Sequence, residues 1–427
     1  MTHRNNSLVT VDGLHNVVTG LGSMHSKRSH NHYDPTFLQG NPIQLESAYT
    51  TDWLATAIVD YPAEDMFREW RTIKCEDADE IQLAELDYGV RDMFEEATKW
   101  SRLYGGSAIV MITDQPLDQP LDMSRIKKGS FKRGLVIDRY MVSTPVMNYT
   151  DIISENFMLP HYYLLNGGSQ RIHWSHVVRI NGRKLPYRMK MQTMGWGDSD
   201  LRRALEDIMD FTASKAGLAE LMAEANVDII TREGLTEDIT TGAESDIIKR
   251  YAMFNQMKSI VQMALLDGDE QYDRQTLNLS GVAPILDMFM TIVSGATGIP
   301  RTRLFGEQSK GLGNSGEGDL NNYYNNCRSM QTSRVSPALR RFDEVFVRSV
   351  LGEMPEDYNY QWNPLYQLDS KEVAEAAKLE ADTDFLYMQS GVVTGSQVMK
   401  KLQQNERYQF TEEQIREAEE AENVSFE

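Results

Sequence analysis

Two apolar helical segments with a short stretch of different character between them constrain this chain more than any other feature. Residues 199–225 carry apolar side chains at helical spacing, and Asp200 stands where an N-cap is expected. At about 1.5 Å per residue, such a helix is about 40 Å long. The second segment, 285–295, is almost wholly apolar, and Pro284 suits its first turn. Residues 226–282 combine short β-type runs with one helix, so the sequence predicts two long helices that flank a small separate unit.

The segments before the first long helix indicate mixed helical and strand structure. A helical pattern at 51–70, punctuated by Pro62, and another at 91–104 precede a buried strand at 107–112. Runs rich in Val, Ile and Tyr predict further strands at 134–142, 161–165 and 176–180.

Behind the second long helix the pattern changes several times. Residues 301–318 are rich in glycine, which favours a mobile loop. A serine followed by Pro337 predicts the start of a helix, and 358–368 is expected to be extended. Residues 370–427 are helical in pattern and acidic. The predicted fold class is therefore α+β, with a mobile polar arm at 1–40.

Charge and cysteine content exclude several classes of protein. The 427 residues hold 43 Lys and Arg against 63 Asp and Glu, a formal net charge of −20. Such acidity repels phosphate and argues against a conventional nucleic-acid binder. No apolar run reaches the ~18 residues that a membrane span needs, so no membrane partner is expected. Cys75 and Cys327 are too few for a zinc cluster or a disulfide scaffold, which favours an intracellular, reducing context.

One dense basic segment stands out in this acidic chain, at 125–133. It is either a solvated loop or a contact with nucleic acid or with an acidic neighbour. The sequence leaves both interpretations open.

The motifs that could carry catalysis are incomplete. The letters at 311–316 match G-x-G-x-x-G, but the dinucleotide fingerprint needs a strand before it, and here a helix precedes. Lys310 is followed by glycine, which excludes a phosphate-binding loop. His173 and Ser175 make one H-x-S motif, whereas phosphodiesterases with paired motifs need a second. The sequence therefore predicts a chain that is not an enzyme, with no catalytic residues, no metal site and no cofactor.

Three segments of the chain resemble tailed-bacteriophage portal proteins. They are RLYGGSAIVMI at 102–112, HWSHVVRI at 173–180 and, most specifically, GIPRTRLFGEQSKGLGNSGEGDLNNYYNN at 298–326. The order of the elements also fits, and the resemblance extends over roughly 50 to 420. It implies a portal-type α+β fold with long stem helices, a small α/β clip, a mixed α/β wing and a helical C-terminal crown.

The resemblance also implies how the chain is divided. The expected parts are the arm at 1–40, the first part of the wing at 41–197, a stem helix at 198–225, the clip at 226–282, a second stem helix at 283–300, the tunnel loop at 301–317, the long helix and second part of the wing at 318–369 and the crown at 370–427. The short β-type runs of the clip are expected to complete one another across adjacent subunits.

The function that the resemblance implies is a dodecameric ring at one capsid vertex. Double-stranded DNA passes through its axis during packaging and ejection. The terminase large subunit docks first and a head–tail adaptor protein later, and the major capsid and scaffolding proteins are further partners. The expected location is the virion, after assembly in the host cytoplasm. In portals the ATPase belongs to the motor, so the resemblance implies no catalytic residue here.

Three groups of site residues follow from the resemblance and the helical pattern. The acidic side chains expected to face the channel are Glu206, Asp207 and Asp210. The side chains expected to pack between subunits are Leu205, Ile208, Phe289 and Ile292. The tunnel-loop residues expected near DNA are Arg301, Arg303, Lys310, Gly311, Gly313 and Gly316. An acidic wall would keep a DNA conduit non-adhesive, although acidity can also serve solubility alone.

Two other functions stay open from the sequence. One is a nucleotide-acting phosphodiesterase related to anti-defence hydrolases, such as one that acts on cyclic oligonucleotides. The other is a generic helical interaction protein, which the composition does not exclude.

Overall fold

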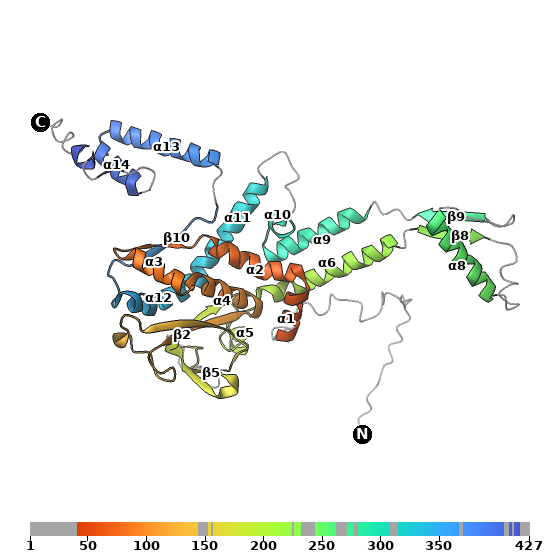
Figure 1. Ribbon diagram of the computed structural model, residues 1–427, viewed down its shortest axis with the longest axis horizontal. Helices are drawn as coiled ribbons and strands as arrows, with labels where there is room; N and C mark the ends of the chain where they lie inside the picture. Colours follow the sequence, from red (N-terminus) through yellow and green to blue (C-terminus); the bar gives the residue numbers. More distant parts are fainter. Residues whose placement is uncertain are drawn as a thin grey trace, which may run out of the picture. The chain divides into compact units, whose positions relative to one another are not determined.

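The computed structural model divides the chain into two compact units, Met1–Asn363 and Pro364–Glu427. The described residues are 41–143, 153–154, 157–223, 226–231, 244–261, 271–276, 281–306, 315–366, 370–404, 410–411 and 414–418. Helices and strands occur together in the first unit (Figure 1), which confirms the α+β fold class.

Four helices open the first unit. They are α1 (Pro42–Thr51), α2 (Trp53–Arg68), α3 (Ala78–Asp87) and α4 (Val90–Tyr104). The last of them confirms the helix expected at 91–104, and it ends at Gly105, whose φ of 86° is one that glycine adopts readily. Helix α2 packs on both α1 and α4.

Helix α2 runs through Pro62 without ending there, so the expected break is wrong. Proline lacks the N–H that would bond the carbonyl of Ile58 one turn earlier. The guanidinium of Arg102 replaces it, donating to the Ile58 carbonyl at 2.7 Å and to the Val59 carbonyl at 3.0 Å. Arg102 of α4 therefore supplies the donor that the Ile58 carbonyl lacks in its own helix. The sequence around Pro62 does not show this distant partner.

Two three-stranded antiparallel sheets follow the helices. In the first, β2 (Gly106–Thr113) lies between β3 (Phe131–Asp138) and β7 (Val177–Asn181). The second consists of β4 (Val142–Ser143), β5 (Tyr162–Leu165) and β6 (Gln170–His173). The strands expected at 107–112, 161–165 and 176–180 are confirmed. The strand expected at 134–142 ends at Asp138, and β6 was not predicted.

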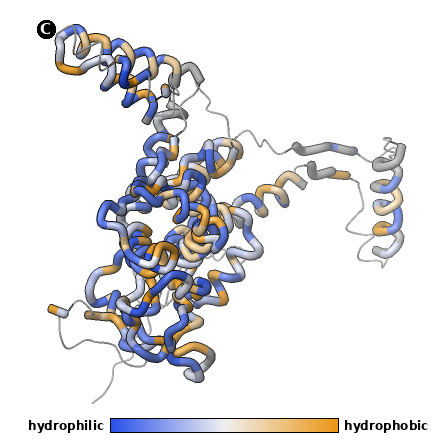
Figure 2. The backbone as a smooth tube through the Cα atoms, turned by 60° about the vertical axis from the view of Figure 1, so that its left-hand side comes forward, coloured by the Kyte–Doolittle hydropathy of each residue, from blue (hydrophilic) through white to orange (hydrophobic). Residues whose placement is uncertain are grey.

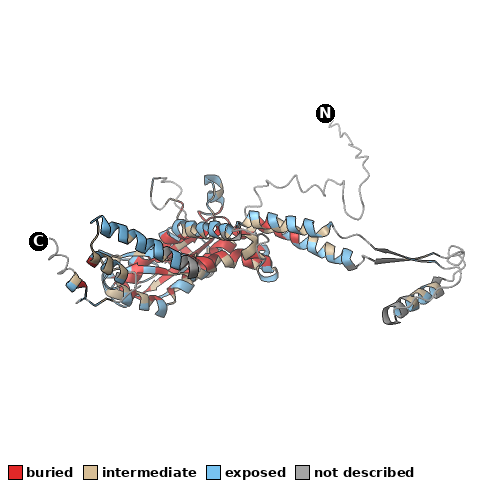
Figure 3. Ribbon diagram, turned by 90° about the horizontal axis from the view of Figure 1, so that it is seen from above, coloured by how far each residue is buried: buried red, intermediate tan, exposed pale blue. Residues whose placement is uncertain are grey.

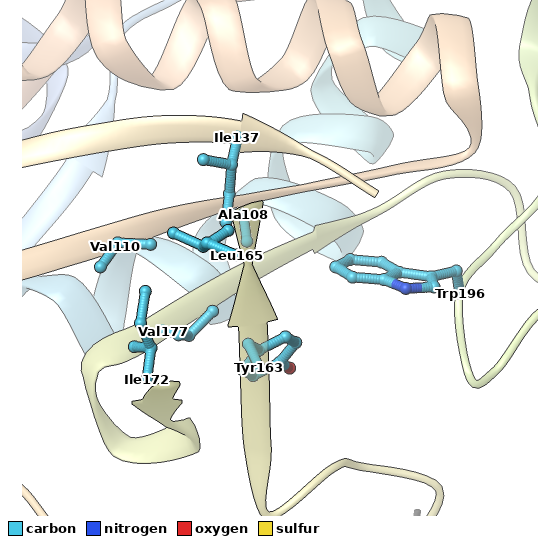
Figure 4. Close-up of a cluster of buried hydrophobic side chains, with 8 residues drawn as sticks. All are labelled: Ala108, Val110, Ile137, Tyr163, Leu165, Ile172, Val177 and Trp196. Atoms are coloured by element: carbon cyan, nitrogen blue, oxygen red, sulfur yellow. The ribbon is translucent and has the colours of Figure 1, made fainter. Parts of the chain in front are cut away.

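A buried apolar cluster joins the two sheets (Figure 4). Val110 of β2 and Val177 of β7 face Tyr163 of β5 and Ile172 of β6, and Trp196 closes one side. One face of each sheet contributes to this cluster, and the two faces cover each other. Strand β2 is buried on its other face too.

A distant pair of strands links the two ends of the first unit. Strand β1 (Arg71–Lys74) pairs antiparallel with β10 (Asn359–Trp362), which confirms the extended segment expected there. The buried Arg71 side chain bonds Glu85 and also Asp343, the latter at 2.7 Å. Each buried charge therefore has an opposite partner.

The predicted pair of long helices is present. Helix α6 (Asp200–Ala223) and α9 (Val282–Thr297) pack against each other (Figure 1). We call this pair the hairpin. Helix α9 begins before Pro284, which stands in the first turn where a missing N–H leaves no helical bond unmade.

Between the hairpin helices lie β8 (Asn226–Thr231), α8 (Glu244–Val261) and β9 (Gln271–Thr276). Strands β8 and β9 pair with each other inside one chain. The pairing expected across adjacent subunits stays a prediction. Strand β9 begins at Gln271, inside the polar run GDEQYD at 268–273, whose composition predicts a turn. The strand expected at 263–267 lies outside the described residues.

After the hairpin comes a short helix, α10 (Arg301–Leu304), and then a long interrupted helix. Its parts are α11 (Ser315–Met330), the π-helical turn η6 (Gln331–Val335) and α12 (Ser336–Leu351). The serine before Pro337 was expected to cap a new helix, but the residues before it are helical too. Pro337 cannot donate to the preceding turn, and the wider π-helical turn lies just before it.

The described residues of the second unit are largely helical, as expected, with α13 (Ser370–Gln389) and α14 (Gly395–Gln404). The remaining short elements of the first unit are η3 (Met123–Arg125), η4 (Asn166–Gly168), η5 (Trp174–His176) and α5 (Tyr187–Gln192). Hydrophobic and hydrophilic residues alternate along the helices (Figure 2). Within the described residues, no helix combines the length and the apolar character needed to cross a bilayer.

Candidate functional site

The hairpin is the candidate functional element, and its base is held by unusually close backbone packing. A Cβ at Gly105 would lie 2.7 Å from the carbonyl oxygen of Gly197, and one at Gly182 would collide with the carbonyl oxygen of Asp198. The backbones of Arg183 and Asp198 also form a β-bridge. Only glycine allows three segments to approach so closely where α6 begins.

Asp200, the first residue of α6, is buried in an arginine cluster. Its carboxylate accepts from Arg102 at 3.3 Å, from Arg183 at 2.8 Å and from Arg334 at 2.9 Å. These arginines come from α4, from the segment after β7 and from η6. One carboxylate therefore fixes the start of the hairpin to three distant parts of the first unit.

The prediction that Asp200 is an N-cap is wrong. Ser199 takes that role, because its hydroxyl accepts from the backbone N–H of Arg202 at 3.1 Å. The Asp200 side chain is directed to the arginines instead. Burial alone would raise the pKa of Asp200, but Arg102, Arg334 and Arg183 outweigh it and hold that pKa well below its usual range.

A second carboxylate, Asp65 of α2, binds the two helices that follow α9 in the chain. It accepts from Arg303 at 3.1 Å and from the Tyr323 hydroxyl at 2.7 Å. The Arg303 guanidinium also lies over the ring of Tyr61, 4.2 Å from its centroid. Arg301 pairs with Asp287 of α9 at 2.5 Å.

The residues expected in a tunnel loop are therefore only partly brought together. Arg301 and Arg303 lie in α10 and pair with carboxylates of their own chain, which accounts for both arginines without DNA. Gly316 lies in α11, so the helix begins before the expected end of the loop. Lys310, and with it Gly311 and Gly313, lies outside the described residues.

Many residues along the hairpin are exposed (Figure 3), and they include both acidic and apolar side chains. Glu206 is exposed, and Asp207 and Asp210 are half-buried. Of the residues expected between subunits, Ile208 is only 2% exposed and so packs inside its own chain, whereas Ile292 is 43% exposed. The other two, Leu205 and Phe289, are half-buried.

Sequence reasoning missed several exposed apolar residues of the hairpin. Met209 and Met288 are each 53% exposed, and Ile285 is 51% exposed. Ile285, Met288 and Ile292 follow each other at intervals of three and four, which places them on one face of α9. That spacing was readable from the sequence.

The H-x-S motif forms the turn between β6 and β7. His173 Nδ1 and Ser175 Oγ lie 2.8 Å apart, and burial lowers the pKa of His173. His176 is fully buried, with Nε2 3.0 Å from the Gln119 carbonyl oxygen. Among the described residues, no group of three or more His, Cys, Asp or Glu side chains is arranged to hold a metal ion.

Asp200→Asn tests the anchor of the hairpin. Removing the charge that three guanidinium groups share should lower the free energy of unfolding by about 3–5 kcal/mol at neutral pH. The folded-state pKa of Asp200 is depressed, so its stabilising contribution is complete above about pH 4 and is lost as pH falls through the folded pKa. The difference between the two proteins should be constant from about pH 7 to about pH 5 and shrink below about pH 4. Urea unfolding followed by circular dichroism measures it.

Glu80→Gln is the matched control, because Glu80 pairs with Lys128 at the surface, where both side chains are at least half exposed. Its loss should not exceed about 1 kcal/mol. Equal losses in the two variants would contradict a special role for Asp200.

Comparison with known proteins connects this geometry to a family. The family described as "Phage portal protein" matches residues 43–386, a range that includes both hairpin helices. The neck of a native gene transfer agent particle, computed with C12 symmetry, is similar in structure, with a TM-score of 0.51 and 14% identity over 83% of this chain and 91% of that chain. At that identity the likeness shows the fold alone.

Two curated relatives differ in what their names say. A protein of Caulobacter sp. (strain RHG1) named anti-CBASS protein Acb1 is 34% identical over 395 residues, which cover 88% of this chain. The chain spans only 62% of that relative's length. An uncharacterized protein of Haemophilus influenzae (strain ATCC 51907 / DSM 11121 / KW20 / Rd) is 28% identical over 92% of this chain and 90% of its own length.

The Acb1 relative contradicts the prediction that this chain is not an enzyme. The anti-CBASS name falls within the anti-defence alternative that the sequence left open, and the identity extends over most of the chain. A single H-x-S motif was too narrow a basis for that prediction.

The helical hairpin, the mixed sheets beside it and the long interrupted helix all fall within one family match, 43–386. This chain belongs to the phage portal protein family.

Proposed function

We propose that copies of this chain form a closed ring of twelve at one capsid vertex and conduct double-stranded DNA during packaging and ejection. The family match over 43–386 carries the proposal, because it includes both hairpin helices and the helix that follows them. The likeness in fold to a particle neck with twelvefold symmetry supports it. The ring belongs to the virion and is assembled in the host cytoplasm.

In this proposal the hairpin lines the channel. Glu206, Asp207 and Asp210 turn the acidic side of α6 toward the DNA, together with the negative charge of the whole chain. Duplex DNA carries a negative charge every ~1.7 Å, so a wall rich in Lys or Arg would hold it and slow translocation. An acidic wall repels the phosphates and lets the duplex slide.

The exposed apolar face of α9 packs against the neighbouring copy. Ile285, Met288 and Ile292 are each more than 40% exposed in the single chain. Burying such side chains between copies contributes about 25 cal/mol for each Å² removed from water. In a ring, each copy meets its two neighbours through two different surfaces, so this face contacts a different patch of the next hairpin.

The segment between the hairpin helices, 226–282, is the docking site for partners in this proposal. Its strands β8 and β9 pair within one chain, which supports a small unit that each copy presents separately. The terminase large subunit docks there during packaging, and a head–tail adaptor protein replaces it. The major capsid and scaffolding proteins contact other parts of the ring.

Lys310 is the side chain that we place nearest the DNA. Arg301 and Arg303 have carboxylate partners in their own chain, so they are less available to phosphate. One lysine per copy gives weak contacts that salt screens, which can retain DNA without stopping it. Gly311 and Gly313 flank the position and allow the backbone to adopt left-handed conformations.

A second candidate function is a nucleotide-acting phosphodiesterase. The observation that favours it is the 34% identity to the Acb1 relative from Caulobacter. Among the described residues, His173 and Ser175 form a pair with geometry suited to proton transfer, since they lie 2.8 Å apart and are only half-buried.

The double variant Met288→Asp/Ile292→Asp tests the interface between copies. Both side chains are largely exposed in the single chain, so the fold should survive, as circular dichroism can verify. A ring would bury two unpaired carboxylates per contact, which costs several kcal/mol and should favour the monomer at least about a hundredfold. Size-exclusion chromatography with light scattering measures this. Met288→Leu/Ile292→Val should still form rings. Rings of normal mass from the double aspartate variant would exclude this face as the contact.

Lys310→Gln tests the loop. In a packaging assay in vitro, we expect rings to form normally and packaged DNA to be lost several times faster, with a weaker dependence on salt. Gly316→Ala is the control, because Gly316 lies in α11, where alanine stabilises a helix by about 1 kcal/mol relative to glycine. Unchanged DNA retention in Lys310→Gln would show that Lys310 does not contact the DNA.

The phosphodiesterase candidate is tested by incubating the purified full chain with cyclic dinucleotides and trinucleotides. It predicts linear products, detected by liquid chromatography, and their loss in His173→Ala. Hydrolysis that persists in His173→Ala would move the activity elsewhere in the chain. No product from either protein would reject the candidate and leave the portal proposal untouched.

A further inference from the structure

A surface cavity lies away from the hairpin, between α3, α12 and the basic segment 125–133. Its volume is about 330 Å³. The rings of Tyr88, Phe131 and Phe346 lie along it, with the Phe131 centroid 5.4 Å from each of the other two. Tyr88 is 44% exposed, whereas Phe131 and Phe346 are buried beneath it. Together with Leu83, Ala84 and Val350, these rings give the cavity an apolar side, which suits a bulky apolar group.

An exposed apolar ridge continues from this cavity along α3. Leu83 lines the cavity and is 63% exposed, and Leu86, three residues further on, is 78% exposed. Residues three apart lie on neighbouring positions of one helix face. Exposed leucines beside an aromatic cavity form a groove of the kind that receives the apolar face of a partner helix.

The charge beside the groove is positive, although the chain as a whole carries −20. The Lys132 ammonium lies 2.7 Å from the carbonyl oxygen of Gly129, which lines the cavity, and Lys127 is the exposed residue next to the cavity-lining Lys128. Lys128 is neutralised by Glu80 at 2.6 Å.

Of the other cations of the segment, Arg125 interacts electrostatically with Asp122. Within the described part of the chain, the residues of the basic segment that form no salt bridge are Arg125, Lys127, Lys132 and Arg133. Helix α3 contributes one further acidic residue to the cavity, Asp87. The positive side of the cavity is therefore the basic segment 125–133, and α3 forms the acidic side.

We propose that this groove binds an amphipathic helix of a partner protein, with a bulky apolar side chain in the aromatic cavity and acidic residues beside Lys127 and Lys132. The aromatic cavity and the ridge of Leu83 and Leu86 favour a protein over a nucleic acid, because phosphates find no apolar counterpart there. The unneutralised lysines select an acidic partner. The surface is separate from the hairpin, so the proposal does not depend on ring formation.

Two synthetic peptides of about 18 residues test the proposal. Both carry leucine along one face of the helix. The positions beside this face are glutamate in one peptide and lysine in the other. Fluorescence anisotropy with the full chain measures binding. We expect the glutamate peptide to bind at least about tenfold more tightly than the lysine peptide, the reverse of what the net charge alone would give. Leu83→Asp should abolish this binding, and Lys127→Glu/Lys132→Glu should invert the preference.

Ile43→Asp is the matched control, because Ile43 is an exposed apolar residue of α1, 69% exposed and not part of the cavity. It should leave binding unchanged. Equal affinity for the two peptides, or binding that Leu83→Asp does not weaken, would overturn the proposal. A third result would also overturn it: the Lys127→Glu/Lys132→Glu variant binds both peptides normally but no longer binds a DNA duplex of about 30 base pairs. The surface would then be a nucleic-acid contact.

Discussion

The structure depends on one buried carboxylate, Asp200, which three arginines share where the hairpin starts. A carboxylate without partners could not be buried there, and the buried guanidinium of Arg102 would be unfavourable without it. The partners come from α4, from the segment after β7 and from η6, which otherwise belong to different layers. The direction in which the hairpin leaves its base is therefore set by charge pairing and by the close glycine contacts beside it.

Arg102 shows how these requirements are connected. The same guanidinium that pairs with Asp200 also donates to the Ile58 carbonyl, which Pro62 leaves without a helical donor. Loss of Arg102 would therefore disturb both α2 and α6. Asp65 of α2 binds Arg303 of α10 and Tyr323 of α11. Arg301 of α10 pairs in turn with Asp287 of α9, so ionic contacts connect α9 to α2 through α10.

The sequence predicted elements whose signal is local. The hairpin followed from apolar spacing, and the strands followed from Val- and Ile-rich runs. It failed where a distant partner decides the outcome. Pro62 continues a helix because of Arg102, and Asp200 is an ionic anchor because of arginines up to 134 residues away. Arg301 and Arg303 looked available to DNA because Asp287 and Asp65 could not be placed beside them from the sequence.

The central claim is that the hairpin lines the axis of a twelvefold ring. Electron cryo-microscopy of the purified full chain tests it most directly, because one map shows both the symmetry and the side on which the hairpin lies. We expect closed rings of twelve copies, with Glu206 facing the axis and with Met288 and Ile292 between neighbouring copies. Monomers or dimers at micromolar concentration, or rings whose hairpins point away from the axis, would contradict it.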